Sequence, residues 1–451
     1  MKVIVAGFNV DSSLLQRIDS DQRSPEVISA AYARISRSSK SVSELRKEAL
    51  GEIGKARKSN RNIIFEMGHA SVAEHAVFNL DLIGISRHLT EVVQRSRYAS
   101  FTEKSQRYVT FEKDYVIPAE LEEFPDLRKR YIRLADSLFA EYKLTLDQLL
   151  KLYAAEHPGI KLRELEGKAK EDARYILPLA TKTQMGATLN ARSIETLLRR
   201  LSGRPESEAR ELHRQIFDSV AAIAPSLIRY TQADDFHNPV PHSALPHIKG
   251  SRTEMPERVT LLTATQNADD SILAGLLFEQ GYGDFPQTLE HLGSLNNDAK
   301  ARLWDHVFHG IKAWHKMPRA FENAGFSFCL SMSECCWGQF KRHRSATMLK
   351  FGAQGQHPAS NPGSRLILPQ GILTIGREKI WQDLHFAVNE FRTSLPASLS
   401  HLSPYLVLNA ESALVQTSMN LREIYHFCRL RSDEHAQWEI RQISDELIRT
   451  V

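Results

Sequence analysis

The sequence predicts a mixed fold of strands and helices, arranged as two tandem modules of similar size. The prediction rests on the length of the chain and on a pattern that occurs twice along it. The chain has 451 residues, and because domains usually hold about 100 to 200 residues, two or three domains are expected. A strand, a serine, a helix and an Arg-x-Arg sequence then follow one another in each half.

The first copy of the pattern begins with residues 78–82, where apolar and polar side chains alternate. This period of two predicts a half-buried strand. Ser86 follows and is a candidate helix N-cap, because its hydroxyl can accept a hydrogen bond from a backbone N–H of the first turn. Apolar residues at helical spacing come next, and the helix is expected to run into Arg95-Ser96-Arg97.

The second copy has the same parts in the same order. Residues 326–332 alternate as a strand does, Ser333 is the candidate cap, and the helix runs into Arg342-His343-Arg344. The first arginine lies nine positions after the serine in both halves, from 86 to 95 and from 333 to 342. The equal spacing indicates an internal repeat, although two unrelated strand–helix units that end in basic residues would be the simpler alternative.

A polar, proline-rich stretch at residues 231–258 separates the two copies. It lacks apolar periodicity, which is typical of a linker or a loop-rich connection. We therefore expect a first module at residues 1–232, a linker at 233–258 and a second module at 259–451.

Long helices are expected at residues 127–152, 206–231 and 432–449, where apolar residues recur every three or four positions. The simplest role for such apolar stripes is to form the core. The opening MKVIVAGF is predicted to be the first strand, since its apolar run is too short for a signal peptide.

The composition is that of a globular protein, and it narrows the class of partner. The formal net charge is +4, from 58 basic and 54 acidic residues. This balance argues against a nucleic-acid coat and against a membrane-surface protein, so an anionic partner must be recognised by a local cluster. Small phosphorylated ligands fit that requirement best.

The four cysteines do not have the spacing of a zinc site or of a disulfide scaffold; they are Cys329, Cys335, Cys336 and Cys428. We expect them to be small buried hydrophobic residues in a reducing compartment. No stretch approaches the roughly 20 apolar residues that a membrane span needs. We therefore expect a soluble, cytoplasmic protein.

The densest functional signal is the segment from Arg95 to Tyr108, RSRYASFTEKSQRY, which is rich in arginine and serine and contains a glutamate. Arginine presents a planar fork of donors that matches phosphate and carboxylate groups, and serine adds short donors. Such a set could hold a phosphate together with a flat polar ring. On composition alone, a solvated basic helix end is the alternative.

The order of residues in this segment is more specific than its composition. It resembles the signature RHRxxSxNExSxRY of flavin-dependent thymidylate synthases. Seven positions match, namely Arg95, Arg97, Ser100, Glu103, Ser105, Arg107 and Tyr108. The chain departs at Ser96, where the family has histidine, and at Thr102, where asparagine is frequent. The resemblance implies that Ser96 in place of this histidine weakens one flavin contact.

The resemblance implies an α+β fold in which each module has an antiparallel sheet flanked by helices. It also implies an enzyme that converts dUMP to dTMP with FAD, taking the methylene from methylenetetrahydrofolate and hydride from NADPH. No glycine-rich dinucleotide fingerprint and no P-loop is present, so NADPH is not expected to bind a Rossmann domain. No histidine pair has zinc spacing, and no metal site is predicted.

The resemblance assigns roles to particular positions. The predicted substrate-binding residues are Glu103, Ser105, Gln106, Arg107, Arg174, Gln339 and Arg431. The predicted flavin-binding residues are Ser36, His75, Arg95, Arg97, Asn420, Arg422, His426 and His435. Arg431 is the predicted catalytic residue, because its charge would stabilise the negative charge that develops on the uracil.

The two modules match different parts of the family pattern. The segment from Asn420 to Arg441 resembles the family's C-terminal segment, which the first module lacks. The second module instead has Lys350, Gln354 and Pro404 where the family has the signature glutamate, the last signature arginine and a later arginine. Val92 stands in the first module at the position of Gln339.

These complementary losses predict composite sites, each built from one first module and one second module. In the family the sites lie at the subunit interfaces of a homotetramer, so a homodimer of tandem chains would mimic that tetramer with two sites. Two other hypotheses remain open at this point. One is a flavoenzyme that acts on another pyrimidine nucleotide, and the other is a non-catalytic nucleotide- or flavin-binding protein.

Overall fold

A computed structural model describes residues 1–14, 23–234, 236, 257–352 and 365–451, which form two compact units. The first unit holds the described residues up to 236 together with Leu368–Asn409. The second unit holds the described residues from 257 to 367 together with Ala410–Val451. Almost all of the predicted linker, residues 233–258, lies outside the described residues.

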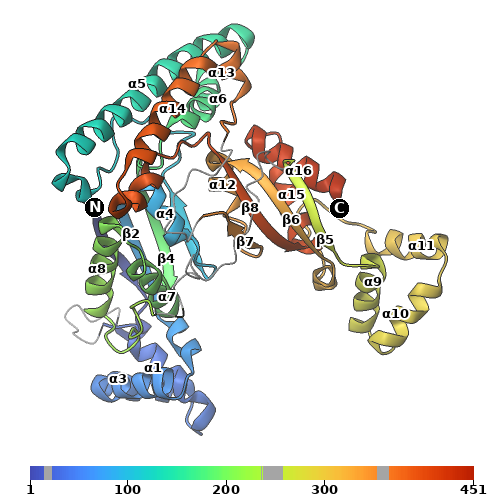
Figure 1. The fold of residues 1–451 in the computed structure, drawn as a ribbon. Helices are drawn as coiled ribbons and strands as arrows, with labels where there is room; N and C mark the ends of the chain where they lie inside the picture. The colour runs from blue at the N-terminus through green and yellow to red at the C-terminus, as the bar shows by residue number, and fades with distance from the viewer. Residues whose placement is uncertain (15–22, 235, 237–256, 353–364) are drawn as a thin grey trace. The chain divides into compact units, whose positions relative to one another are not determined.

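The sheet of the first unit has four antiparallel strands in the order β1-β2-β4-β3 (Figure 1). They are β1 (Lys2–Phe8), β2 (Val77–Ser86), β3 (Ala99–Glu103) and β4 (Lys182–Asn190). Burial alternates along most of β2 and β4, as the period of two predicts. Gly84 lies at a shift of the β2–β4 register with φ of 72°, a conformation that favours glycine.

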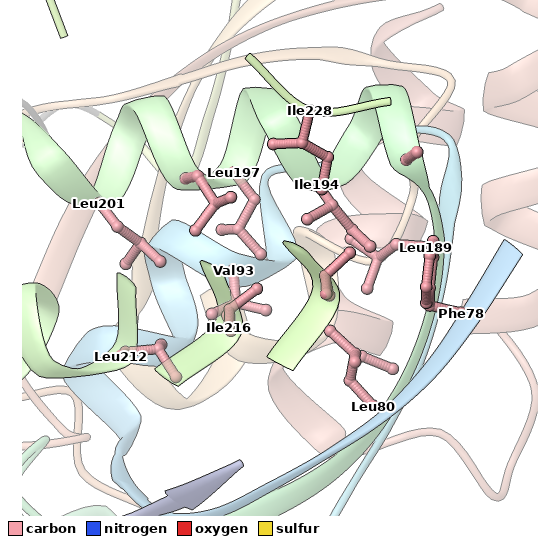
Figure 2. Close-up of a cluster of buried hydrophobic side chains, with 14 of the residues drawn as sticks. Phe78, Leu80, Val93, Leu189, Ile194, Leu197, Leu201, Leu212, Ile216 and Ile228 are labelled. Atoms are coloured by element: carbon pink, nitrogen blue, oxygen red, sulfur yellow. The ribbon is translucent and has the colours of Figure 1, made fainter. Parts of the chain in front are cut away.

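Three helices supply the apolar residues that pack against the inner face of this sheet. They are α4 (Arg87–Gln94), α7 (Ala191–Ser202) and α8 (Ser207–Ala221). Figure 2 shows Leu201 and Ile194 of α7 in the buried cluster that also contains Phe78 and Leu80 of β2. The predicted helix at 206–231 was too long, because Pro225 follows four residues after the end of α8 and disfavours a continuing helix.

Helices α1 (Glu26–Arg34), α2 (Val42–Gly51) and α3 (Ile53–Arg61) pack around a small core of their own in the first unit. This core is rich in alanine, which allows the helices to approach closely. The short helices η2 (Ile35–Arg37) and η4 (Ala70–His75) flank this group, and η4 leads into β2.

A second helical layer of the first unit contains α5 (Pro125–Glu156), α6 (Leu162–Ala173), α13 (Gln370–Thr374) and α14 (Glu378–Ser394). The helix predicted at 127–152 is confirmed and is a few residues longer. Helices α5 and α14 lie side by side (Figure 1).

Buried polar contacts join these two long helices. The Glu141 carboxylate of α5 accepts hydrogen bonds from Arg377 Nε at 2.9 Å and from Trp381 Nε1 at 3.0 Å. Residues 370–394, which follow the second signature in the sequence, are thus anchored to the first unit.

Two short segments of the first unit pair about a local pseudo-twofold axis. Leu179 N donates to Val407 O at 2.8 Å, and Asn409 N donates to Leu177 O at 2.9 Å. The segments come from corresponding places in the two copies of the repeat, each directly before the strand β4 or β8. A contact with this symmetry is what two copies of one module form in an isologous interface.

The second unit repeats the sheet of the first, with the strand order β5-β6-β8-β7. Its strands are β5 (Val259–Ala264), β6 (Gly325–Ser333), β7 (Thr347–Lys350) and β8 (Ser412–Asn420), all antiparallel to their neighbours. The predicted α+β fold class, with an antiparallel sheet and flanking helices in each half, is therefore confirmed.

Helices α12 (Glu334–Phe340), α15 (Leu421–Arg431) and α16 (Trp438–Thr450) pack on the second sheet. The last predicted helix, at 432–449, begins later than expected. Gln437 caps α16, and its Oε1 accepts a hydrogen bond from Ile440 N at 3.1 Å.

A separate group of three helices extends the second unit: α9 (Ala268–Glu279), α10 (Phe285–Ser294) and α11 (Asn297–Val307). Leu273, Ala274 and Leu292 form its small core.

The two predicted serine caps are confirmed, and each is held in the same way. Ser86 Oγ accepts from Leu89 N, and its own N–H donates to Glu208 Oε1 at 2.7 Å. Ser333 repeats this arrangement with Glu439 Oε1, also at 2.7 Å. The repeat therefore extends to these buried hydrogen bonds. They join the N-terminus of α4 to α8 in the first unit, and the N-terminus of α12 to α16 in the second.

The four cysteines carry free thiols, and all but Cys329 are buried, as expected for small hydrophobic residues. Among the described residues, none of the helices combines the length and the apolar character that a bilayer crossing requires.

Candidate functional site

Glu103 ends β3 and is held in a buried ion pair. Its carboxylate accepts hydrogen bonds from Arg87 Nη1 at 2.8 Å and from Gln94 Nε2 at 2.9 Å, and only 2% of its side chain is exposed. Both donors lie on α4. Glu103 thus fixes the end of β3 to α4, and it sets the position of the loop that follows.

That loop carries Ser105 and Arg107. Two of the predicted substrate-binding arginines, Arg107 and Arg174, contact Glu171 near the end of α6. Arg107 Nε donates to Glu171 Oε2 at 2.6 Å, and Arg174 Nε donates to Glu171 O at 3.2 Å. Ser105 Oγ accepts the backbone N–H of Arg107 at 3.1 Å, which tightens the turn. The predicted residues Ser105, Arg107 and Arg174 therefore lie together.

Gln106 belongs to the same cluster but points into the protein. Asn409 Nδ2 donates to Gln106 Oε1 at 3.1 Å and to Arg174 O at 2.9 Å. Gln106 is 2% exposed, and no residue of the described ranges accepts a hydrogen bond from its Nε2. A buried amide donor without an acceptor is unfavourable, so this atom is suited to a bound polar group or water.

Glu171 and Asn409 were missed by the sequence reasoning. Asn409 is 303 positions from Gln106 in the chain, and no local pattern marks either residue.

Arg95, one of the predicted flavin-binding arginines of the first module, lies near further positive charge. Partial desolvation lowers the pKa of Arg95, and the charge of Arg204 adds to this while Glu91 opposes it. Desolvation also lowers the pKa of Arg200, together with the charge of Arg95. Arg200 Nη1 donates to Ser96 Oγ at 3.4 Å, at the position where the resembled signature has histidine. Mutually repelling guanidinium groups fit an anionic ligand such as a dinucleotide phosphate.

Ser36 and His75 lie in the helical group that precedes β2. Ser36 is exposed in η2. His75 ends η4, is exposed, and its ring meets Tyr32 of α1 edge-on at 4.8 Å. The structure does not bring either residue into contact with the cluster around Glu171.

In the second unit Arg431 is held by a histidine. Arg431 Nε donates to His343 Nε2 at 3.0 Å, and His343 Nδ1 lies 3.6 Å from Glu423 Oε1. Burial lowers the pKa of His343, the contact with Glu423 raises it, and the charge of Arg431 lowers it. His426 lies beside this group, with its ring 6.2 Å from that of His343.

The other predicted residues of the second unit have local partners. Gln339 Nε2 donates to Gln437 Oε1 at 3.4 Å, and Asn420 caps α15. Arg422 binds Met317 O at 2.8 Å and Glu322 Oε1 at 3.1 Å.

His435 is exposed between α15 and α16, and its ring lies 3.7 Å from Glu434. Among the predicted residues of the second unit, the structure thus brings together Arg431 and His426, whereas Arg422 faces the segment before β6.

The sheet registers explain why the first module cannot supply the two substrate residues that are predicted in the second. Asn190 and Asn420 occupy equivalent positions at the ends of β4 and β8. Counting from these asparagines, Leu201 of the first module is equivalent to Arg431 of the second. Leu201 is fully buried in the core, as Figure 2 shows. Val92, at the position of Gln339, is 8% exposed and belongs to the same core.

Comparison with known protein families gives matches in both halves of the chain. The family model described as "Thymidylate synthase complementing protein" matches residues 17–226 and again residues 260–451. The flavin-dependent thymidylate synthase of Clostridium tetani is 32% identical over 225 residues, which cover 49% of this chain and 88% of that protein. That of Mycobacterium tuberculosis (strain H37Rv) is 36% identical over 167 residues, or 36% of this chain and 65% of that protein.

Solved structures with some likeness cover about half of this chain. One is flavin-dependent thymidylate synthase ThyX from Helicobacter pylori complexed with FAD and dUMP, with 18% identity, a TM-score of 0.33 and coverage of 51% of this chain and 100% of that one. Another is the UMP/dUMP methylase PolB from Streptomyces cacaoi bound with 5-Br dUMP, with 19% identity, a TM-score of 0.36 and coverage of 50% and 92%.

Proposed function

We propose a function from one premise: the chain belongs to the flavin-dependent thymidylate synthase family. This membership confirms the resemblance seen in the signature, and it confirms the prediction that the chain is an enzyme of this class. We propose that the enzyme methylates dUMP to dTMP, with FAD as cofactor and with methylenetetrahydrofolate and NADPH as co-substrates.

The observation that carries the proposal is the cluster of Arg107, Arg174 and Gln106 around Glu171 and Asn409. Two guanidinium groups that meet at one residue can present several donors to a phosphate. The Glu171 carboxylate pairs with Arg107, and the backbone carbonyl of Glu171 accepts from Arg174. Contacts that order the arginines before the ligand binds lower the ordering entropy that binding would otherwise cost. Arg107 and Ser105 are assigned to the phosphate end of the nucleotide, with Arg174 beside them.

The flavin, when bound, supplies the redox chemistry of the reaction. Its proposed ligands in the first module are Arg95, Arg97, Ser36 and His75. The proposed ligands in the second module are Asn420, Arg422, His426 and His435. The charges around Arg95 suit the phosphates of the cofactor, whereas Asn420 and Arg422 already have protein partners.

Arg431 is the proposed catalytic residue, assigned to the uracil. A fixed positive charge beside the ring stabilises negative charge that develops as C5 becomes nucleophilic. Gln339 is assigned to the same nucleotide, so that the second module contributes hydrogen-bond donors and the first module holds the phosphate.

We further propose that each site takes residues from a first module and a second module, and that the enzyme is a homodimer of tandem chains with two such sites. The support for this comes from the complementary losses along the sequence. Leu201 and Val92 are core residues in the first module, whereas the second module has Lys350 and Pro404 at positions of the nucleotide set.

Anaerobic turnover of the purified protein with FAD, NADPH, dUMP and methylenetetrahydrofolate tests the proposal, with chromatography for dTMP. We expect dTMP to form. Flavin reduction that dUMP stimulates, without dTMP, would instead indicate a different one-carbon donor or another pyrimidine acceptor. A protein that neither binds flavin nor responds to dUMP would overturn the proposed activity.

A further inference from the structure

Three residues of the second unit form a connected chain of polar contacts that ends at the proposed catalytic arginine. Glu423 and Arg431 both lie on α15, eight positions apart, so that they face the same side of the helix two turns from each other. His343, which follows α12, bridges them with its two ring nitrogens. The bridging histidine is 5% exposed and Glu423 is 8% exposed.

The chemistry of the donors fixes the protonation of His343. A guanidinium group can only donate hydrogen bonds, so His343 Nε2 must accept the bond from Arg431 Nε and carries no proton. The proton of the neutral ring is then on Nδ1, which faces the carboxylate of Glu423. The lowered pKa of His343 agrees with a neutral ring.

Packing holds the histidine ring in this orientation. Its centroid lies 4.7 Å from that of Phe427, edge-on at 75°, and 6.5 Å from that of Phe340. Phe427 lies on α15 midway between Glu423 and Arg431. The ring therefore rests on the helix face that presents both of its polar partners.

The first module has a different residue at each of the three positions of this chain of contacts. Ser96 stands in place of His343, Ser193 in place of Glu423, and Leu201 in place of Arg431. The helix and the turn still touch there, but through Arg200 and Ser96. A contact that served only to pack α15 against α12 would not need to change as a complete set.

We propose that His343 and Glu423 are positioning residues, which hold the guanidinium plane of Arg431 in the orientation that the nucleotide requires. The inference rests on the proposed function, since it assigns Arg431 to the uracil. The Glu423 carboxylate attracts the Nδ1–H of His343 and so orients the imidazole. The unprotonated Nε2 of the imidazole accepts the Nε–H of Arg431 and so orients the guanidinium.

Nuclear magnetic resonance of ¹⁵N-histidine-labelled full-length protein tests the contacts without any assay of activity. The charged or titratable groups that act on His343 within the described residues are Glu423, His426 and Arg431, all on α15. We expect the native ring to be the Nδ1–H tautomer, the E423A variant to lower the pKa of His343, and the R431A variant to raise it. Unchanged tautomer and pKa in both variants would overturn the proposed chain.

Steady-state kinetics with dUMP then test the positioning role. We expect E423A and H343L to lower kcat by about tenfold to a hundredfold, as misplacement of a reactive group does. H343Q should recover part of this, because its amide oxygen can accept the Arg431 hydrogen bond. The matched control is S193A, at the position in the first module that corresponds to Glu423, and it should keep native kinetics.

A double variant separates positioning from general loss of structure. If His343 acts through Arg431, H343L/R431A should be no slower than R431A alone. Losses that multiply, together with a lowered melting temperature and no recovery in H343Q, would show a merely structural role. If the native protein does not turn over dUMP, the proposed function fails, whereas the tautomer and pKa measurements still decide whether the contacts exist.

Discussion

The two modules contain the same ion pair with opposite polarity. In the first, Arg87 at the start of α4 pairs with Glu103 at the end of β3, at 2.8 Å. In the second, Glu334 at the start of α12 pairs with Lys350 at the end of β7, at 2.5 Å. Each partner follows the capping serine or ends the short strand, so the positions correspond.

This comparison separates what the fold needs from what the chemistry needs. Both modules keep opposite charges at these largely buried positions, because a single unpaired charge there would be costly. The positions of the acidic and the basic partner can be exchanged. In the second module the basic partner, Lys350, stands where the resembled signature has glutamate. The second module could thus lose the nucleotide pattern without losing the contact between helix and strand.

The largest effect is expected when an arginine of one module is replaced by the residue at the equivalent position of the other module. Leu201 is equivalent to Arg431, and Gln354 is equivalent to Arg107. R431L should lower kcat by about a hundredfold, because a charge aimed at the uracil is lost. R107Q should instead raise KM for dUMP by about tenfold or more, because a charge-assisted phosphate contact is lost. Steady-state kinetics measure both effects, and L430A, at an exposed neighbour of Arg431, is the control. Native kinetics in either arginine variant would contradict the division of roles.

Inverting the ion pair of the first module tests the comparison itself. E103K alone places a lysine beside Arg87 at a buried position, so that two positive charges lie together. We expect this variant to destabilise the protein by about 3 to 5 kcal/mol. The double variant R87E/E103K copies the polarity of the second module and should recover most of the melting temperature, but not dUMP binding. Thermal denaturation and calorimetric titration measure these two quantities. A double variant no more stable than E103K would refute the shared structural role.

A smaller difference concerns the residues at the N-cap positions of α8 and α16, which are Glu206 and Gln437. Burial raises the pKa of Glu206, but hydrogen bonds and charges from His88 and Arg204 lower it to about 2, against an ordinary value of 4.5. The stabilisation from this group is therefore complete above pH 4.5 and is lost as the pH falls toward 2, a loss of about 3 kcal/mol. Gln437 cannot titrate in this way.

Denaturant unfolding at several pH values tests that difference. Between pH 5 and pH 3 the free energy of unfolding should fall more steeply for the native protein than for E206Q. Equal slopes would show that Glu206 is not a source of acid sensitivity.

The smallest effect is expected at the bulge of β2, which β6 lacks. Gly84 has φ of 72°, and a Cβ there would meet Met1 atoms only at ordinary distances of 3.7 Å or more. G84A should therefore cost about 1 kcal/mol through backbone conformation alone. Gly186 of the adjacent β4 has ordinary φ, and a Cβ added to it would have no neighbouring atom within 4 Å, so G186A should be neutral or slightly stabilising. Equal melting temperatures for the two variants would exclude backbone strain.

Local patterns predicted the parts of the fold that depend on neighbouring residues. The alternation at 78–82 and the positions of Ser86 and Ser333 fixed the strands and caps, because a period of two and a cap hydrogen bond act within a few residues. The ends of α8 and α16 were less well predicted, since the apolar stripe continues past the residues that terminate each helix.

The composition of the site was only partly predictable. The arginines could be recognised from the family resemblance. Glu171, which pairs with Arg107, and Asn409, which donates to the backbone carbonyl of Arg174, are instead brought to these partners by tertiary folding. The role of His343 as the partner of Arg431 was equally hidden, because 88 positions separate the two residues. Conversely, the carboxylate of Glu103 is held by Arg87, a residue that no motif singled out.

Calorimetric titration of dUMP into the native protein, R107A, R431A and the double variant tests the central claim, that both modules contribute to one nucleotide site. We predict a single class of site in the native protein and a weakened affinity at every site in each single variant. A variant that keeps half of its sites at native affinity would show that each module binds its own nucleotide, and it would contradict the composite site.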